Sequence, residues 1–242
     1  MSIGDRGVTP YIAFCTPINR YGISLAMPEK TSAPPPSLIR DLAAHRTTLK
    51  DHPHWRFVDL AKMMPDVPLD IRYAGSDNFT GRVLYPNATA LLRQAAADAL
   101  AAARQALRQQ GLDLLIYDAY RPYSVTLMLW EQLQDERYVA APWTGSRHNR
   151  GCAVDVTLID AASGEPLAMP TAYDEFSERA HQTYHALPAE VLAHRACLRR
   201  VMQRHGFEPL PSEWWHFDLR GWQEYPLLDL PFADLQNDGV FV

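Results

Sequence analysis

The sequence predicts an α+β fold in which helices flank a central, mainly antiparallel sheet. Two observations favour it: helical and short strand-like segments mix without a regular strand–helix–strand alternation, and the chain has neither a G-x-G-x-x-G fingerprint nor a phosphate-binding loop. The 242 residues, 47% of them hydrophobic and 21% charged, suffice for one large buried core.

The domain organisation is read from composition. Residues 1–36 show no sustained periodicity and end in SAPPPS, a segment that favours an extended, polyproline-like linker. We therefore expect an N-terminal extension over residues 1–36. No comparable break and no internal repeat follows, so residues 37–242 are predicted to form a single domain.

Four segments carry clear element signals. Residues 89–111 are rich in strong helix formers and end in Gly111, which suits a left-handed helix cap. The apolar segment 112–118 has the length of a strand, and Pro122 is placed to begin a helix that runs to about Gln134. A second amphipathic helix is predicted over residues 187–206, with Pro188 near its start and Gly206 at its end.

Charge and cysteine content exclude several classes of protein. The net charge is -5 and the basic residues are scattered, so no nucleic-acid partner is expected. The apolar runs fall well short of the roughly 18 residues of a membrane span, and the N-terminus lacks a signal-peptide pattern, so we expect a cytoplasmic protein. Cys15, Cys152 and Cys197 have no C-x-x-C spacing and are expected to be buried or idle thiols.

The segment SRHNRGCAVDVTL (146–158) contains a candidate pair of metal ligands. The β-branched residues after position 152 predict a strand over 153–159, with Ala153, Asp155 and Thr157 on one face. His148 and Asp155 would lie roughly 23 Å apart on an extended chain. Sharing one metal ion therefore requires a bend, which Gly151 can supply through a positive φ. The alternative is a solvated loop histidine and a turn-forming aspartate.

A second cluster, PSEWWHFD (211–218), offers another histidine. Strand alternation would place Trp214, His216 and Asp218 on one face, and Trp215 and Phe217 in the core. Glu213 would reach the same ion only through a bulge or loop at the start of the strand. Two histidines and one carboxylate leave the fourth tetrahedral position to water, as in catalytic zinc sites. Glu213 is then the candidate general base, the alternative being an exposed surface acid.

These residues carry a family resemblance. The pattern S-x-H-x-x-G-x-A-x-D at 146–155, together with E-x-W-H at 213–216, resembles the zinc D-alanyl-D-alanine dipeptidases of the vancomycin-resistance type, relatives of D-Ala-D-Ala carboxypeptidases and of hedgehog-like folds. Residues 70–85, 117–122 and 169–182 also stand in the order of that family, so the resemblance covers roughly residues 55–220.

The resemblance implies hydrolysis of a small dipeptide, D-alanyl-D-alanine, with one zinc ion per chain. It implies a set of site residues: His148, Asp155 and His216 as zinc ligands, Glu213 as general base, Arg121 as oxyanion partner, and Asp174 and Ser146 at the substrate's ammonium group. Pro170 and Tyr173 depart from the family pattern, which usually has Gly and Phe at these positions.

Several alternatives stay open at the sequence level. Arg121 is otherwise a structural ion-pair residue and Asp174 a turn or cap acid. HQTYH (181–185) places two histidines four residues apart, which we interpret as a solvated helical face. The competing functions are a carboxypeptidase or peptidoglycan endopeptidase of the same fold, and a zinc-binding interaction module without catalysis. The oligomeric state is not predicted.

Overall fold

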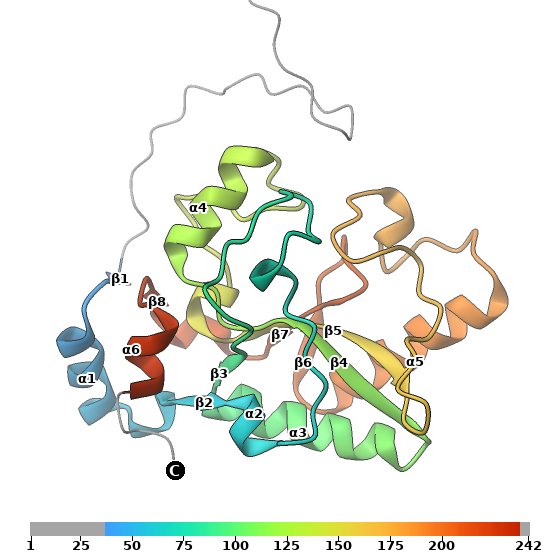
Figure 1. Cartoon of the computed structure of the whole chain (residues 1–242), viewed down its shortest axis with the longest axis horizontal. Helices are drawn as coiled ribbons and strands as arrows, with labels where there is room; N and C mark the ends of the chain where they lie inside the picture. The colour runs from blue at the N-terminus through green and yellow to red at the C-terminus, as the bar shows by residue number, and fades with distance from the viewer. Residues whose placement is uncertain (1–36, 238–242) are drawn as a thin grey trace, which may run out of the picture. The chain divides into compact units, whose positions relative to one another are not determined.

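A central four-stranded sheet organises the fold. The computed structural model describes residues 37–237, so the expected extension over residues 1–36, and Cys15 within it, lie outside the described residues. The strands follow the spatial order β4 (Leu112–Asp118), β5 (Ala153–Asp160), β7 (His216–Leu219) and β6 (Phe207–Pro209), and every pair is antiparallel (Figure 1). The predicted α+β class with a mainly antiparallel sheet is confirmed.

Smaller elements surround this sheet. Two further two-stranded sheets pair β2 (Phe57–Asp59) with β3 (Leu91–Arg93) and, in parallel, β1 (Leu38–Ile39) with β8 (Leu227–Leu228). The helices are α1 (Leu42–Asp51), α2 (Leu60–Met63), α3 (Gln94–Arg108), α4 (Tyr123–Gln132), α5 (Ala189–Arg204) and α6 (Phe232–Asn237). Short 3-10 turns are η1 (Pro53–Trp55), η2 (Arg72–Ala74), η3 (His148–Arg150), η4 (Glu178–Ala180) and η5 (Trp222–Glu224).

Helix α3 is shorter than the helix predicted over residues 89–111. Its first predicted turn is instead strand β3, because Leu91–Arg93 pairs with β2 and tertiary pairing overrides the local helix propensity. The predicted end is confirmed: Gly111 has a φ of 76°, and its N–H donates to the carbonyl of Arg108.

The helices that follow prolines are confirmed. Pro122 precedes α4 and Pro188 precedes α5, in agreement with the fixed φ that suits proline to a helix start. Helix α4 ends at Gln132, two residues before the predicted end, and Gly206 (φ 93°) follows α5. Helices α3 and α5 contact each other and the central strands, and in Figure 1 α3 lies below the strands and α4 above them.

The segment HQTYH (181–185) is not a helix, contrary to the prediction. It forms a turn after η4. Gln182 is buried there, and its backbone N–H donates to the carbonyl of Pro211, which is distant in the chain, rather than to a helical neighbour. His185 is exposed and His181 half-buried. Within the described residues, Cys152 is buried and Cys197 half-buried, both as free thiols. No helix in residues 37–237 is long and apolar enough to cross a membrane.

Candidate metal and active site

The register of the central sheet places three polar residues in a row. Asp155 on β5 pairs directly with His216 on β7, and on the other side with Asp118 on β4, after an irregularity in β4. Directly opposed residues of antiparallel strands project to the same face. Asp118, Asp155 and His216 are therefore gathered on one face of the sheet, and all three are buried.

The turn η3 brings His148 back over this face. The predicted bend at Gly151 is confirmed: its φ is 69°, and its N–H donates to the carbonyl of His148. The side chain of Asn149 fixes the turn, because it accepts the Ser146 N–H at 2.7 Å and donates to the Arg121 carbonyl at 2.8 Å. Hydrogen bonds of Asn149 therefore stabilise the turn internally and also hold it against the segment that follows β4.

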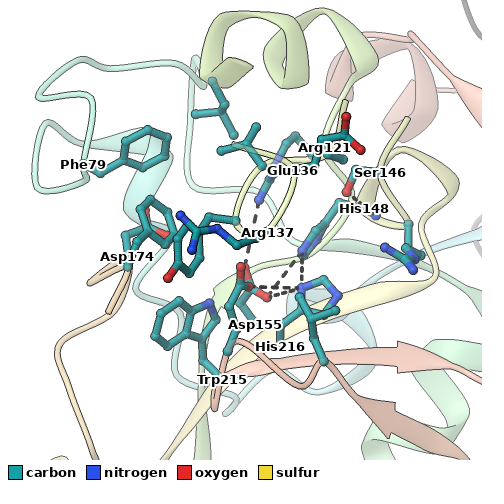
Figure 2. A pocket seen from close by; sticks show the side chains of 18 of the residues that line it. Phe79, Arg121, Glu136, Arg137, Ser146, His148, Asp155, Asp174, Trp215 and His216 are labelled. Atoms are coloured by element: carbon teal, nitrogen blue, oxygen red, sulfur yellow. Dashed lines mark hydrogen bonds and ion pairs between the residues drawn. The ribbon is translucent and has the colours of Figure 1, made fainter. Parts of the chain in front are cut away.

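Three donor atoms form a nearly equilateral triangle at the centre of the pocket. His148 Nε2 lies 3.1 Å from His216 Nδ1 and 3.3 Å from Asp155 Oδ1, and His216 Nδ1 lies 3.0 Å from that oxygen (Figure 2). Donors bound tetrahedrally at about 2.0 Å from one zinc ion are separated by about 3.3 Å. The sequence-predicted ligands His148, Asp155 and His216 are brought together in the arrangement that suits zinc.

Hydrogen bonds orient both imidazole rings. His148 Nδ1 lies 2.7 Å from the Ala119 carbonyl, which requires the proton on Nδ1 and leaves Nε2 free as a ligand. His216 Nε2 lies 2.8 Å from Asp218 Oδ1, which leaves Nδ1 for the metal. Partners of this kind fix the tautomer and direction of metal-binding histidines. The sequence placed Asp218 on the correct face but gave no sign of this role.

The charge on Asp155 also fits a cation. Burial alone would raise its pKa, but the facing rings of His148 and His216 hold the pKa of this carboxyl well below its usual range. Its Oδ1 atom is buried and accepts no hydrogen bond from the described residues. An anionic oxygen without a donor, aimed at two ring nitrogens, is a natural ligand for a divalent cation.

Glu213 reaches the site from a loop rather than from a strand. Strand β7 begins only at His216, and the preceding turn is closed by hydrogen bonds from Glu213 N to Leu210 O and from Leu210 N to His216 O. The predicted loop at the strand entry is thus confirmed, whereas alternation does not extend back to Trp214. Glu213 Oε2 lies 3.9 Å from His216 Nδ1, and burial raises the pKa of Glu213 to about 8.

Arg121 lies near Asp155 Oδ2, whereas the two histidines face Oδ1. Its guanidinium donates through Nε and Nη2 to Asp118 at 3.0 and 2.6 Å, and Nη2 is 4.0 Å from Asp155 Oδ2. Asp118 in turn accepts the Tyr85 hydroxyl at 2.8 Å. Although burial disfavours the charge, Asp118 raises the pKa of Arg121 well above its usual value. Arg121 therefore makes the structural ion pair and lines the pocket as well.

Asp174 provides a second buried carboxyl group in the pocket. The Tyr73 hydroxyl donates to its Oδ2 at 3.1 Å, and its φ of 59° is unusual for a residue other than glycine. Burial and the charge of Asp155 raise the pKa of Asp174 to about 8, although Arg121 opposes the shift. Within residues 37–237 Tyr73 is the one side-chain donor to this carboxyl, and a buried carboxyl with so few donors is suited to bind a cationic group.

Ser146 is not beside Asp174. Figure 2 shows the two residues on opposite sides of the ligand triangle. The Ser146 hydroxyl oxygen accepts the backbone N–H of His148 at 3.2 Å, which places Ser146 in the support of η3. Both residues line the same pocket as the triangle, Glu213 and Arg121.

Aromatic side chains form one wall of this pocket. Phe176 packs against Phe79 and Tyr138, with ring centroids 5.1 and 5.0 Å apart. Trp215 is buried, in agreement with its predicted core position, and it also lines the pocket. Asp118, Tyr138 and Phe176 were not predicted from the sequence, since no local pattern links them to the metal ligands.

Comparisons with known proteins place the chain in a family. The family model described as D-ala-D-ala dipeptidase matches residues 54–238. A D-alanyl-D-alanine dipeptidase of Escherichia coli (strain K12) is 42% identical over 183 residues, which cover 76% of this chain and 94% of that protein. One of Enterococcus faecalis (strain ATCC 700802 / V583) is 31% identical over 198 residues, covering 74% and 94%. The chain therefore belongs to the D-ala-D-ala dipeptidase family.

Proposed function

We propose that the chain hydrolyses D-alanyl-D-alanine to two D-alanines with the help of one zinc ion. The observation that carries this proposal is the buried triangle of donor atoms from His148, Asp155 and His216, with Glu213 and Arg121 in the same pocket. The named activity of the Escherichia coli and Enterococcus faecalis relatives supports the choice of substrate.

Two imidazoles and one carboxylate would hold the metal. When bound there, zinc would polarise the scissile carbonyl and lower the pKa of the attacking water. Glu213 is suited to accept the proton of that water, because its carboxylate lies beside the metal-facing nitrogen of His216 without being needed as a ligand. The same carboxyl then returns the proton to the amine nitrogen of the leaving D-alanine, which balances the reaction.

Arg121 is suited to the negative charge that develops on the carbonyl oxygen. Its guanidinium stays protonated, is held in place by Asp118, and faces the pocket 4.0 Å from Asp155. A fixed cation in a pocket shielded from water stabilises an oxyanion much more strongly than it would in bulk water. The ion pair with Asp118 therefore holds the Arg121 guanidinium in position for the proposed catalytic role, and the structural and catalytic roles are compatible.

Asp174 provides the basis for preferring a free dipeptide. A dipeptide carries an ammonium group one residue away from the scissile bond, and the buried carboxyl of Asp174 lies in the same pocket. Binding this cation would compensate the burial of the carboxylate. An acylated substrate has no such charge and would leave Asp174 without its partner. The expected shared role of Ser146 at the ammonium group has less support, because Ser146 lies across the pocket.

The substrate assay tests this proposal. Purified protein is incubated with D-Ala-D-Ala, L-Ala-L-Ala and N-acetyl-D-Ala-D-Ala, with zinc or with a chelator, and free alanine is measured. We expect release from D-Ala-D-Ala alone, lost with chelator and restored by zinc. Release only from the acetylated compound would identify a carboxypeptidase. Zinc binding without any release would identify a binding module.

The cytoplasmic location and the domain boundary at residue 36 remain predictions from the sequence. Cell fractionation with an antibody to the protein tests the first. Limited proteolysis tests the second, with cleavage expected near residue 36 and a resistant fragment that begins there.

A further inference from the structure

The two oxygen atoms of Asp155 have different surroundings. Oδ1 faces the ring nitrogens of His148 and His216 at 3.3 and 3.0 Å and accepts no hydrogen bond from the described residues. Oδ2 accepts a hydrogen bond of 2.9 Å from the hydroxyl of Tyr173. One oxygen is thus left for a metal, and the other is held by a neutral donor.

Tyr173 is fixed by neighbouring aromatic rings. Its ring lies 4.7 Å from that of Tyr117 on β4 and 5.4 Å from that of Trp215 in the loop before β7. The ring of Tyr73 lies edge-on at 6.3 Å. This packing leaves the phenol little freedom to move, so the direction of its hydroxyl is set by the fold.

Tyr173 does not line the pocket, although Asp155 does. Its hydroxyl donates to Asp155 and can act on the site through that carboxylate. An unsupported carboxylate can rotate and offer either oxygen, or both, to a cation. A phenol donates one proton at neutral pH, and a hydrogen bond to Oδ2 restricts that rotation. Such partners of metal ligands typically contribute about 10- to 100-fold in metal affinity.

We propose that Tyr173 is a positioning residue whose hydroxyl holds Asp155 Oδ2, so that Oδ1 alone is presented to the zinc ion. The inference rests on the proposed zinc site and adds a determinant of its affinity. It gives a physical role to a hydroxyl at a position where the family resemblance predicts phenylalanine.

Zinc affinity tests this proposal directly. The dissociation constant for zinc is measured by competition with a chromophoric chelator in the wild-type protein, in Tyr173→Phe and in Tyr117→Phe. The control removes the same atom from the adjacent ring, whose hydroxyl lies near Thr157 and Arg72 rather than a metal ligand. We expect zinc to bind about 10- to 100-fold more weakly to Tyr173→Phe, and with little change to Tyr117→Phe.

Melting temperatures of the chelator-treated proteins show whether each variant keeps its fold. Equal zinc affinity in Tyr173→Phe and the wild type would overturn the proposal, as would an equal loss in both variants. A wild-type protein that binds zinc but releases no alanine would contradict the proposed function, whereas the comparison of zinc affinities would still decide the role of Tyr173. A wild-type protein that binds no zinc would overturn both.

Discussion

Glu213 and His148 lie in one pocket, and the tasks we propose for them are separable. Glu213 Oε2 is 3.9 Å from His216 Nδ1, outside the triangle of donor atoms, whereas His148 Nε2 is one of its corners. Both side chains are buried, so burial does not distinguish them. The proposed tasks differ in their chemistry: an imidazole is suited to bind zinc, and a carboxylate is suited to transfer a proton.

Substituting each residue separates these tasks. Glu213→Gln keeps the shape of the side chain but removes the base, and we expect kcat to fall by about 10²- to 10⁴-fold with zinc content unchanged. His148→Ala removes a ligand, and we expect zinc itself to be lost. Zinc content by atomic spectroscopy and alanine release are measured on the same preparations. Near-full turnover by Glu213→Gln would show that the base is another group.

At the scale of elements, the turn η3 depends on one glycine. Gly151 has a φ of 69°, and a Cβ built there would clash with the Phe57 ring. Gly164 has a similar φ of 75°, but a Cβ there meets nothing within 4 Å. Both positions therefore require a left-handed backbone that strains any residue with a side chain, but only at Gly151 would the added Cβ also meet a neighbouring side chain.

This pair of glycines gives a matched prediction. We expect Gly164→Ala to lower the free energy of unfolding by about 1–2 kcal/mol, the cost of a left-handed residue with a side chain. Gly151→Ala should cost about 1–3 kcal/mol more, because Phe57 must also move, and should weaken zinc binding through His148. Urea denaturation and a zinc titration measure the two effects. Equal destabilisation by both variants would contradict the account of η3.

The sequence predicted those parts of the fold that local patterns determine. Periodicity and backbone preference predict strands β4 and β5, the starts of α4 and α5 after a proline, and the bend at Gly151. Strand β3 at the expected start of α3, and the turn at residues 181–185, depend on long-range pairing instead. Local propensity does not contain that information.

The same division applies to the site. His148, Asp155 and His216 were candidates because metal ligands are restricted to a few residue types, the family resemblance implied the full set, and the structure places them together. Asp118 and Tyr173 also contact site residues directly. Nothing in the sequence around them indicates these contacts, because the contacts form only when the chain folds. Sequence reasoning found candidate chemistry and missed the residues that hold it in position.

At the scale of the whole molecule, the site links segments that are distant in the chain. His148 and His216 are 68 residues apart, and η3, β5 and β7 each provide one corner of the triangle. The buried carboxyl of Asp174 adds an energetic cost, because its pKa is raised from 3.8 in an exposed chain to about 8 in the folded protein. The folded state therefore binds more protons than the unfolded state between these values.

This linkage predicts how stability depends on pH. In the metal-free protein, the contribution of Asp174 to the free energy of unfolding falls as the pH rises from about 4 to about 8. Asp174→Asn removes the titrating group, so the variant should become progressively more stable relative to the wild type over this range. Urea denaturation at pH 5, 6.5 and 8 in the presence of chelator measures the difference. Parallel pH profiles would show that Asp174 does not titrate as described.

The most direct test of the proposed zinc site is a crystal structure of the zinc-loaded protein, with anomalous diffraction recorded at the zinc edge. We expect one anomalous peak per chain, at about 2.0–2.2 Å from His148 Nε2, His216 Nδ1 and Asp155 Oδ1. A peak bound by other residues, or zinc-loaded crystals in which these three atoms point to different centres, would contradict the proposed zinc site.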